Sequence, residues 1–181
     1  MTNAINKGKL NNLTNEIWKS AERLRGKFKA YEYQSVILPI IVIRRLECVL
    51  IEWRKIKAEE IRGKRPAIGE KELEQLVKKL ELNPKEIPFS NKTNWTLQAT
   101  IKEDPTLTEQ NFRDYIKGFS DNIQDIIEHF NYRAVIGQMA KNSRLAPILN
   151  QYATEPLGPE HLIRSCLRNR RDVIRCKGAS S

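Results

Sequence analysis

Residues 36–43 read VILPIIVI, an unbroken apolar run with a proline at position 39. Apolar residues on both sides of the run recur at steps of three and four, the spacing of one face of a helix. They are Leu10, Leu13, Ile17, Ala21, Leu24 and Phe28 before it, and Leu46, Val49, Leu50, Trp53 and Ile56 after it. The β-branched residues of the run also fit a buried strand, but the flanking helical pattern favours helix. A helix that is apolar all round belongs at the centre of a bundle, with Pro39 kinking it or lying near the start of its second half.

The rest of the chain gives further helical segments and no convincing strand alternation or internal repeat. We expect Thr14 or Asn12 to cap the first helix and Gly26 to end it. The stretches 61–71 and 83–95 are expected to be irregular because of their glycine and proline content. Helices are expected at residues 73–80, 95–103, 108–117 (capped by Thr108 and stopped by Gly118), 120–130 from Ser120, and as a pair within 132–153. The sequence therefore predicts an all-α, multi-helix bundle of about seven helices over residues 1–160, followed by a loosely ordered basic C-terminal tail, residues 161–181.

The net charge of +10 over 181 residues is unevenly distributed. Residues 1–66 hold 15 Lys and Arg against 7 Asp and Glu, residues 67–160 hold 11 against 14, and residues 161–181 hold 6 against 1. A basic N-terminal third indicates a surface for a polyanion, with nucleic acid as the leading partner and an acidic protein surface as the second.

Residues with catalytic or metal-binding chemistry are sparse. The glycines are too scattered for a phosphate-binding loop, and His129 and His161 have no metal-ligand spacing to Cys48, Cys166 or Cys176. The paired glutamates lie among lysines, which is typical of solvated helix surfaces. We therefore expect no catalytic, cofactor-binding or metal-binding residue in this chain.

The N-terminus has no apolar core like that of a signal peptide, and the longest apolar run is far below the ~20 residues of a membrane span. An odd number of cysteines without metal spacing is typical of free thiols. A soluble, cytoplasmic protein without a membrane partner is expected.

The candidate DNA-binding residues are cations on the first helix, after it, beside the apolar run and in the stretch RGKRP: Lys19, Arg23, Lys27, Lys29, Arg44, Arg45, Arg62, Lys64 and Arg65. The alternative is that these residues are ordinary charged helix surface. No zinc finger, recognition-helix signature or stacking aromatic pair indicates base-specific readout.

The segment IWKSAERLRGKFKAYEYQSVILPIIVIRRLECVL, residues 17–50, resembles the N-terminal segment of the DNA-methylating (modification) subunit of type I restriction–modification systems. The matching features are Trp18, Arg25–Gly26, Glu32–Tyr33, Val36–Pro39 and Arg44–Leu46. The segments FSNKTNWTLQATIKEDP and NFRDYIKGFSDNIQDIIEHF resemble the next two family segments, the latter through Asp114–Ile116, Gly118–Ser120 and Asn122. The resemblance covers roughly residues 14–160.

The resemblance implies a helical N-terminal domain that helps to close the complex around duplex DNA. The implied partners are the specificity subunit, the catalytic methyltransferase domain and the restriction subunit. In the family, a following domain binds S-adenosylmethionine and methylates adenine N6 in a flipped base. That domain's glycine-rich turn and Asn-Pro-Pro-aromatic motif are missing here, since Asn83–Pro84 continues as Lys85–Glu86. The chain is thus expected not to be an enzyme on its own.

From about residue 163 the sequence departs from the family pattern and becomes more basic. A frameshift, an early stop or a cloning boundary would account for this. Two alternatives stay open: a stand-alone basic helical module that binds duplex DNA non-specifically, and a remnant of a disrupted gene.

Overall fold

The computed structural model describes residues 7–102 and 105–159, and these residues form helices without a strand. The helices are α1 (Lys7–Leu24), α2 (Tyr33–Lys64), α3 (Glu70–Glu81), α4 (Ala99–Lys102), α5 (Thr108–Lys117), α6 (Asp121–His129), α7 (Tyr132–Lys141) and α8 (Leu145–Ala153), with short 3-10 turns at Ala30–Glu32 and Pro105–Leu107. The all-α prediction is confirmed. The expected tail, residues 161–181, lies outside the described residues.

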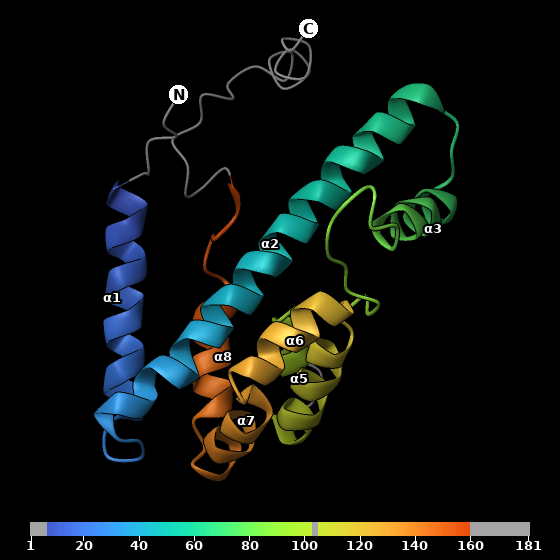
Figure 1. Ribbon diagram of the computed structural model, residues 1–181. Helices are drawn as coiled ribbons and strands as arrows, with labels where there is room; N and C mark the ends of the chain where they lie inside the picture. The colour runs from blue at the N-terminus through green and yellow to red at the C-terminus, as the bar shows by residue number, and fades with distance from the viewer. Residues whose placement is uncertain (1–6, 103–104, 160–181) are drawn as a thin grey trace, which may run out of the picture.

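Helix α2 is the axis of the molecule (Figure 1). Its 32 residues give it a length of about 48 Å at 1.5 Å per residue. The first half packs against α1, α7 and α8, while α3 lies along the second half, which extends beyond the other helices. The apolar run is therefore a central helix, as its pattern predicts.

Pro39 lies in the second turn of α2 and is buried. The helix is continuous through it, so Pro39 does not mark the start of a second half. A proline removes one backbone donor, here the N–H that would reach the Ser35 carbonyl. Burial of Val36, Ile37 and Ile40 around it compensates for that loss, since each side chain is at most 5% exposed.

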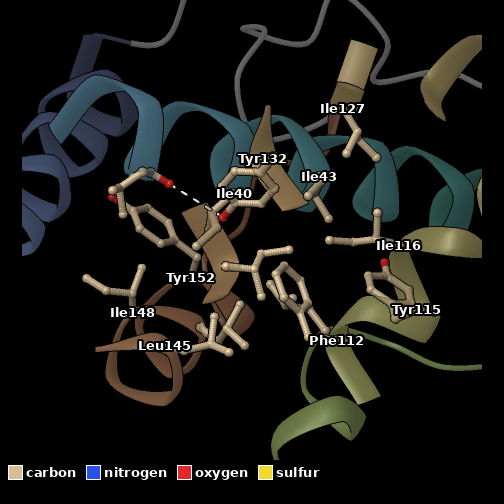
Figure 2. Packing of buried hydrophobic residues seen from close by; sticks show 14 of the residues in the cluster. Ile40, Ile43, Phe112, Tyr115, Ile116, Ile127, Tyr132, Leu145, Ile148 and Tyr152 are labelled. Atoms are coloured by element: carbon tan, nitrogen blue, oxygen red, sulfur yellow. Dashed lines mark hydrogen bonds between the residues drawn. The ribbon is translucent and has the colours of Figure 1, made fainter. Parts of the chain in front are cut away.

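The core lies where α2, α5, α6, α7 and α8 meet, and Figure 2 shows its centre. Ile40 and Ile43 of α2 face aromatic side chains of α5 and α7. The rings of Phe112 and Tyr132 meet edge to face, 6.4 Å between centroids, and the Tyr132 hydroxyl donates to the Val36 carbonyl at 3.5 Å. These contacts fix the first half of α2 against the short helices.

Helix α1 differs from its predicted form. It begins at Lys7, so Asn12 and Thr14 lie inside it rather than capping it, and the Thr14 hydroxyl donates to the Leu10 carbonyl. Gly26 does end the helix, with a φ of 76°. Of the predicted apolar stripe only Leu24 and Phe28 are buried. Three apolar side chains of α1 are exposed: Leu10, Ile17 and Trp18, at 45%, 36% and 68%.

Other helix boundaries in the structure also differ from those predicted from the sequence. Residues 61–64 continue α2, so the irregular connection to α3 is much shorter than the expected 61–71. The helix expected at 95–103 is only the single turn of α4. Helix α5 has the expected bounds, but Thr108 is its first residue and Leu107 the cap. The helices expected at 73–80, 120–130 and 132–153 are confirmed as α3, α6 and the pair α7 and α8.

Candidate nucleic-acid interface

The nine predicted DNA-binding cations do not form one patch. Two lie on α1, two in the loop that follows it, two in the middle of α2, and three at the far end of α2. Because α2 is about 48 Å long, its two ends are separate surfaces.

The α1–α2 loop holds Lys27 and Lys29, both exposed. Leu24 and Phe28, 0% and 6% exposed, anchor the loop to the core between these lysines. The backbone N–H of Lys29 donates to the Glu32 carboxylate at 2.7 Å. The loop therefore has a fixed backbone and presents its ammonium groups to solvent.

The two α1 cations are bonded to neighbouring side chains. Lys19 Nζ lies 2.5 Å from Glu16 Oε1, and Arg23 donates to the Gln151 side chain of α8. The hydrogen bond from Lys19 lowers the pKa of Glu16 below its usual value. Gln151 also donates to the Glu16 carboxylate at 2.8 Å, so these groups link α1 to α8.

Arg44 and Arg45 have structural partners. Arg44 Nε donates to the Glu155 carbonyl at 2.9 Å, and its guanidinium also binds the buried carboxylate of Glu47. Arg45 donates to the Leu157 carbonyl. Both arginines are half-buried and hold the segment that follows α8 against α2. Their hydrogen-bonding capacity is thus directed into the domain.

The predicted flexible basic loop, residues 62–66, is instead mostly the last turn of α2. Arg62 and Lys64 are helical, and Arg65 is the helix cap. Arg62 binds the Glu70 carboxylate of α3, with one contact at 2.6 Å. Lys64 and Arg65 are exposed.

A buried carboxylate between α2 and α3, that of Glu81, was not predicted, because no local pattern in the sequence indicates it. The side chain of Glu81 has no exposed surface and accepts two hydrogen bonds from Arg54, at 2.6 and 2.9 Å. It also accepts the backbone N–H of Asn91 at 3.0 Å. Burial alone would raise the pKa of Glu81, but the Arg54 and Asn91 hydrogen bonds and the charges of Arg54 and Lys78 outweigh burial and lower it.

Two of the sequence segments that carry the family resemblance contact each other directly. Residues 90–93 pair with the turn between α5 and α6: the Ser120 N–H donates to the Ser90 carbonyl at 2.9 Å, and the Lys92 N–H to the Gly118 carbonyl at 2.7 Å. The Asn91 side chain donates to the Tyr115 carbonyl at 3.2 Å. Ser120, the expected first residue of the helix, is the cap residue of α6, and its hydroxyl accepts from the Ser90 N–H and donates to Asn122. These residues therefore have structural roles.

Asn83–Pro84 lies in the turn after α3. The Asn83 side-chain oxygen accepts the Lys85 N–H at 3.1 Å, a local turn bond. Among the described residues no group of three His, Cys, Asp or Glu side chains is placed to hold a metal ion. None of the helices described is long and apolar enough to cross a membrane.

Comparison with known proteins identifies the family. The family model of the HsdM N-terminal domain matches residues 13–151, most of the chain. Among curated proteins, the methylase subunit of the type I restriction enzyme MjaIX of Methanocaldococcus jannaschii is 40% identical over 47 residues. That match covers 26% of this chain and 8% of the relative, so the chain spans only a small part of its relative's length. No solved structure gives a significant match.

The chain belongs to the HsdM N-terminal domain family, the helical domain of the type I methyltransferase subunit. The resemblance stated from residues 17–50, 89–105 and 111–130 is confirmed.

Proposed function

We propose that this chain is the DNA-clamping and subunit-assembly domain of an adenine-N6 DNA methyltransferase subunit in a type I restriction–modification system. The family match over residues 13–151 carries the proposal. Its proposed partners are duplex DNA and the specificity subunit, catalytic methyltransferase domain and restriction subunit of the same system. S-adenosylmethionine belongs to the catalytic domain in this proposal, not to the present chain.

The chemistry of the chain supports a non-catalytic role. Transfer to a flipped adenine needs polar groups that hold the exocyclic amine and an aromatic ring to stack on the base. Asn83 is followed by a single proline and then Lys85, and its side-chain oxygen is engaged in a turn. The pure chain, mixed with duplex DNA and labelled S-adenosylmethionine, should incorporate no label. Incorporation that scales with the amount of chain would contradict the proposal.

Assembly is tested by co-expression. A tagged copy of the chain should retain the specificity subunit or the catalytic domain of its system on affinity resin. An unrelated helical protein of similar positive charge, carrying the same tag, controls for electrostatic adsorption. If neither partner is retained above that control at about 0.15 M salt, where surface charges are screened beyond ~8 Å, the assembly role fails.

The DNA role is tested with the same components. A clamp gains affinity from several subunits closing together, so the chain alone should bind duplex DNA weakly and only at low salt, and the assembly should bind far more tightly. Tight binding by the chain alone, unchanged by its partners, would favour a stand-alone module that binds DNA non-specifically.

A further inference from the structure

We propose that duplex DNA contacts this domain at one end of the bundle, formed by the α1–α2 loop (residues 23–31) and the α7–α8 turn (residues 141–144). We call this surface the basic end. The inference rests on the proposed DNA-clamping function and names the surface that performs it. Lys141 in the α7–α8 turn was not among the cations predicted from the sequence.

The basic end and the far end of α2 differ in net charge. Residues 23–31 hold four Lys and Arg and no acidic residue, and residues 141–144 hold two Lys and Arg and no acidic residue. Both stretches reach the same end of the molecule, the lower end in Figure 1. At the far end of α2, residues 59–72 hold four basic residues, Lys71 among them, and four acidic residues. Of these two described ends, the basic end therefore has the larger net positive charge, which attracts phosphates.

Some charges of the basic end are paired with carboxylates, and three of its lysine ammonium groups are not, among the described residues. Glu22 binds Arg25 at 2.6 Å, and Glu32 accepts the Lys29 backbone N–H. In the part of the chain that the structure describes, the ammonium groups of Lys27, Lys29 and Lys141 make no ion pair. At the other end of α2, Arg62 is neutralised by Glu70.

The loop is also preorganised for a phosphate backbone. The φ of 76° at Gly26 turns the chain sharply, and the buried side chains of Leu24 and Phe28 hold the loop in place. A fixed loop loses little conformational freedom on binding. The Tyr31 ring, 75% exposed, lies beside the Lys29 ammonium, 5.7 Å from its centroid, and offers a flat apolar surface next to the positive charge.

The test compares two triple variants of the whole chain. The first, Lys27→Gln/Lys29→Gln/Lys141→Gln, removes three charges from the basic end. Its matched control, Lys64→Gln/Arg65→Gln/Lys71→Gln, removes three exposed charges from the far end of α2. All six side chains are exposed, so both variants should fold like the parent, which circular dichroism checks. Residues 161–181 are identical in all three proteins, so their charges do not affect the comparison.

Affinity for a random-sequence duplex is measured as a function of salt, starting at low salt. Each lost phosphate contact should make the log–log slope shallower by about 0.9, so the basic-end variant should lose close to 3 units if all three lysines bind. The far-end control should keep the parent slope. Tyr31→Ala should weaken binding without changing the slope, because the ring is uncharged.

The outcomes separate this inference from the proposed function. A slope change in the far-end control equal to or larger than that of the basic-end variant would overturn the basic end as the contact surface, while DNA clamping would stand. The same conclusion follows if neither variant changes the slope. If the parent chain and its assembly show no salt-dependent DNA binding, the clamping role itself fails.

Discussion

The backbone of Gly118 lies directly against the amide side chain of Asn91, so a β-carbon at residue 118 would overlap the Asn91 oxygen and approach Thr93 Cγ2 at 2.6 Å. Asn91 cannot move away easily, because its oxygen accepts the Thr93 N–H and hydroxyl at 2.9 and 2.8 Å. The φ of −69° at Gly118 is ordinary, so the glycine is required for space and not for backbone conformation.

Gly118→Ala should therefore destabilise the domain by about 1–3 kcal/mol, the usual cost of overpacking. Gly63→Ala is the matched control, because Gly63 lies in the last turns of α2, where an added β-carbon would meet no atom of another element within 4 Å. That variant should be neutral or more stable by up to about 1 kcal/mol. Urea unfolding followed by circular dichroism measures both. Equal stabilities for the two variants would show that the 90–93 segment yields without cost.

Glu81→Gln tests the buried pair with Arg54. The substitution leaves the Arg54 guanidinium, 26% exposed, without its anionic partner, and should cost about 3 kcal/mol. Glu70→Gln is the control: the Arg62–Glu70 pair is more than half exposed on both sides and should contribute less than about 1 kcal/mol. If urea unfolding shows the same small loss of unfolding free energy for both variants, the Arg54–Glu81 pair does not hold α3 against α2.

The same carboxylate should make stability depend on acid pH. The pKa of Glu81 is lowered in the folded chain from its usual value of 4.5. Its contribution is therefore fully present above pH 4.5 and is lost as the pH falls through the lower folded pKa. Protonated Glu81 resembles glutamine, so the difference in unfolding free energy between parent and Glu81→Gln should be constant from about pH 7 to 5 and narrow below that range. A difference that stays constant to the acid-unfolding limit would contradict this assignment.

Local patterns in the sequence predicted the helical class and several helix positions well. Leu73 and Val77, for example, mark the buried side of α3 at helical spacing. Glycine was misleading at the end of α2, because Gly63 lies inside the helix, whereas the flanking helical pattern correctly favoured helix across Pro39. Whether a helix continues past such residues is decided by tertiary packing, which no local pattern contains.

The candidate site was predictable only as a set of cations. Sequence shows that Arg44 and Arg45 are adjacent and basic, but their partners, the carbonyls of Glu155 and Leu157, lie more than a hundred positions away. The Glu81–Arg54 pair and the contact between Asn91 and Gly118 are likewise non-local. Helix periodicity predicts which face of a helix is apolar, but on α1 it did not predict how much of that face is covered.

Arg45→Ala should loosen the segment after α8. The lost hydrogen bond from a charged group to the Leu157 carbonyl should cost about 2 kcal/mol and expose the buried Leu157 side chain to proteases. Limited proteolysis with mass spectrometry should find earlier cleavage near residue 157. Arg65→Ala, at an exposed helix cap, should leave both stability and cleavage within error of the parent. Unchanged cleavage in Arg45→Ala would show that Arg44 alone is sufficient to hold the segment.

Alkaline pH should weaken the fold through its buried tyrosines. Burial raises the pKa of Tyr152 to about 12, despite the opposing hydrogen bond with Ser20, and raises the pKa values of Tyr115 and Tyr132 well above their usual 10. Above about pH 10 the unfolded chain loses these protons while the folded chain keeps them, so stability falls as the pH rises.

Near-ultraviolet absorbance of tyrosinate is measured between about pH 9 and 12. It should appear at higher pH in the folded chain than in the chain unfolded by urea. Tyr152→Phe should reduce the alkaline loss of stability, whereas Tyr31→Phe, at an exposed side chain, controls for loss of a hydroxyl alone. If Tyr115, Tyr132 and Tyr152 of the folded chain ionise near the usual tyrosine pKa of 10, then water reaches these side chains, and the core is looser than its packing indicates.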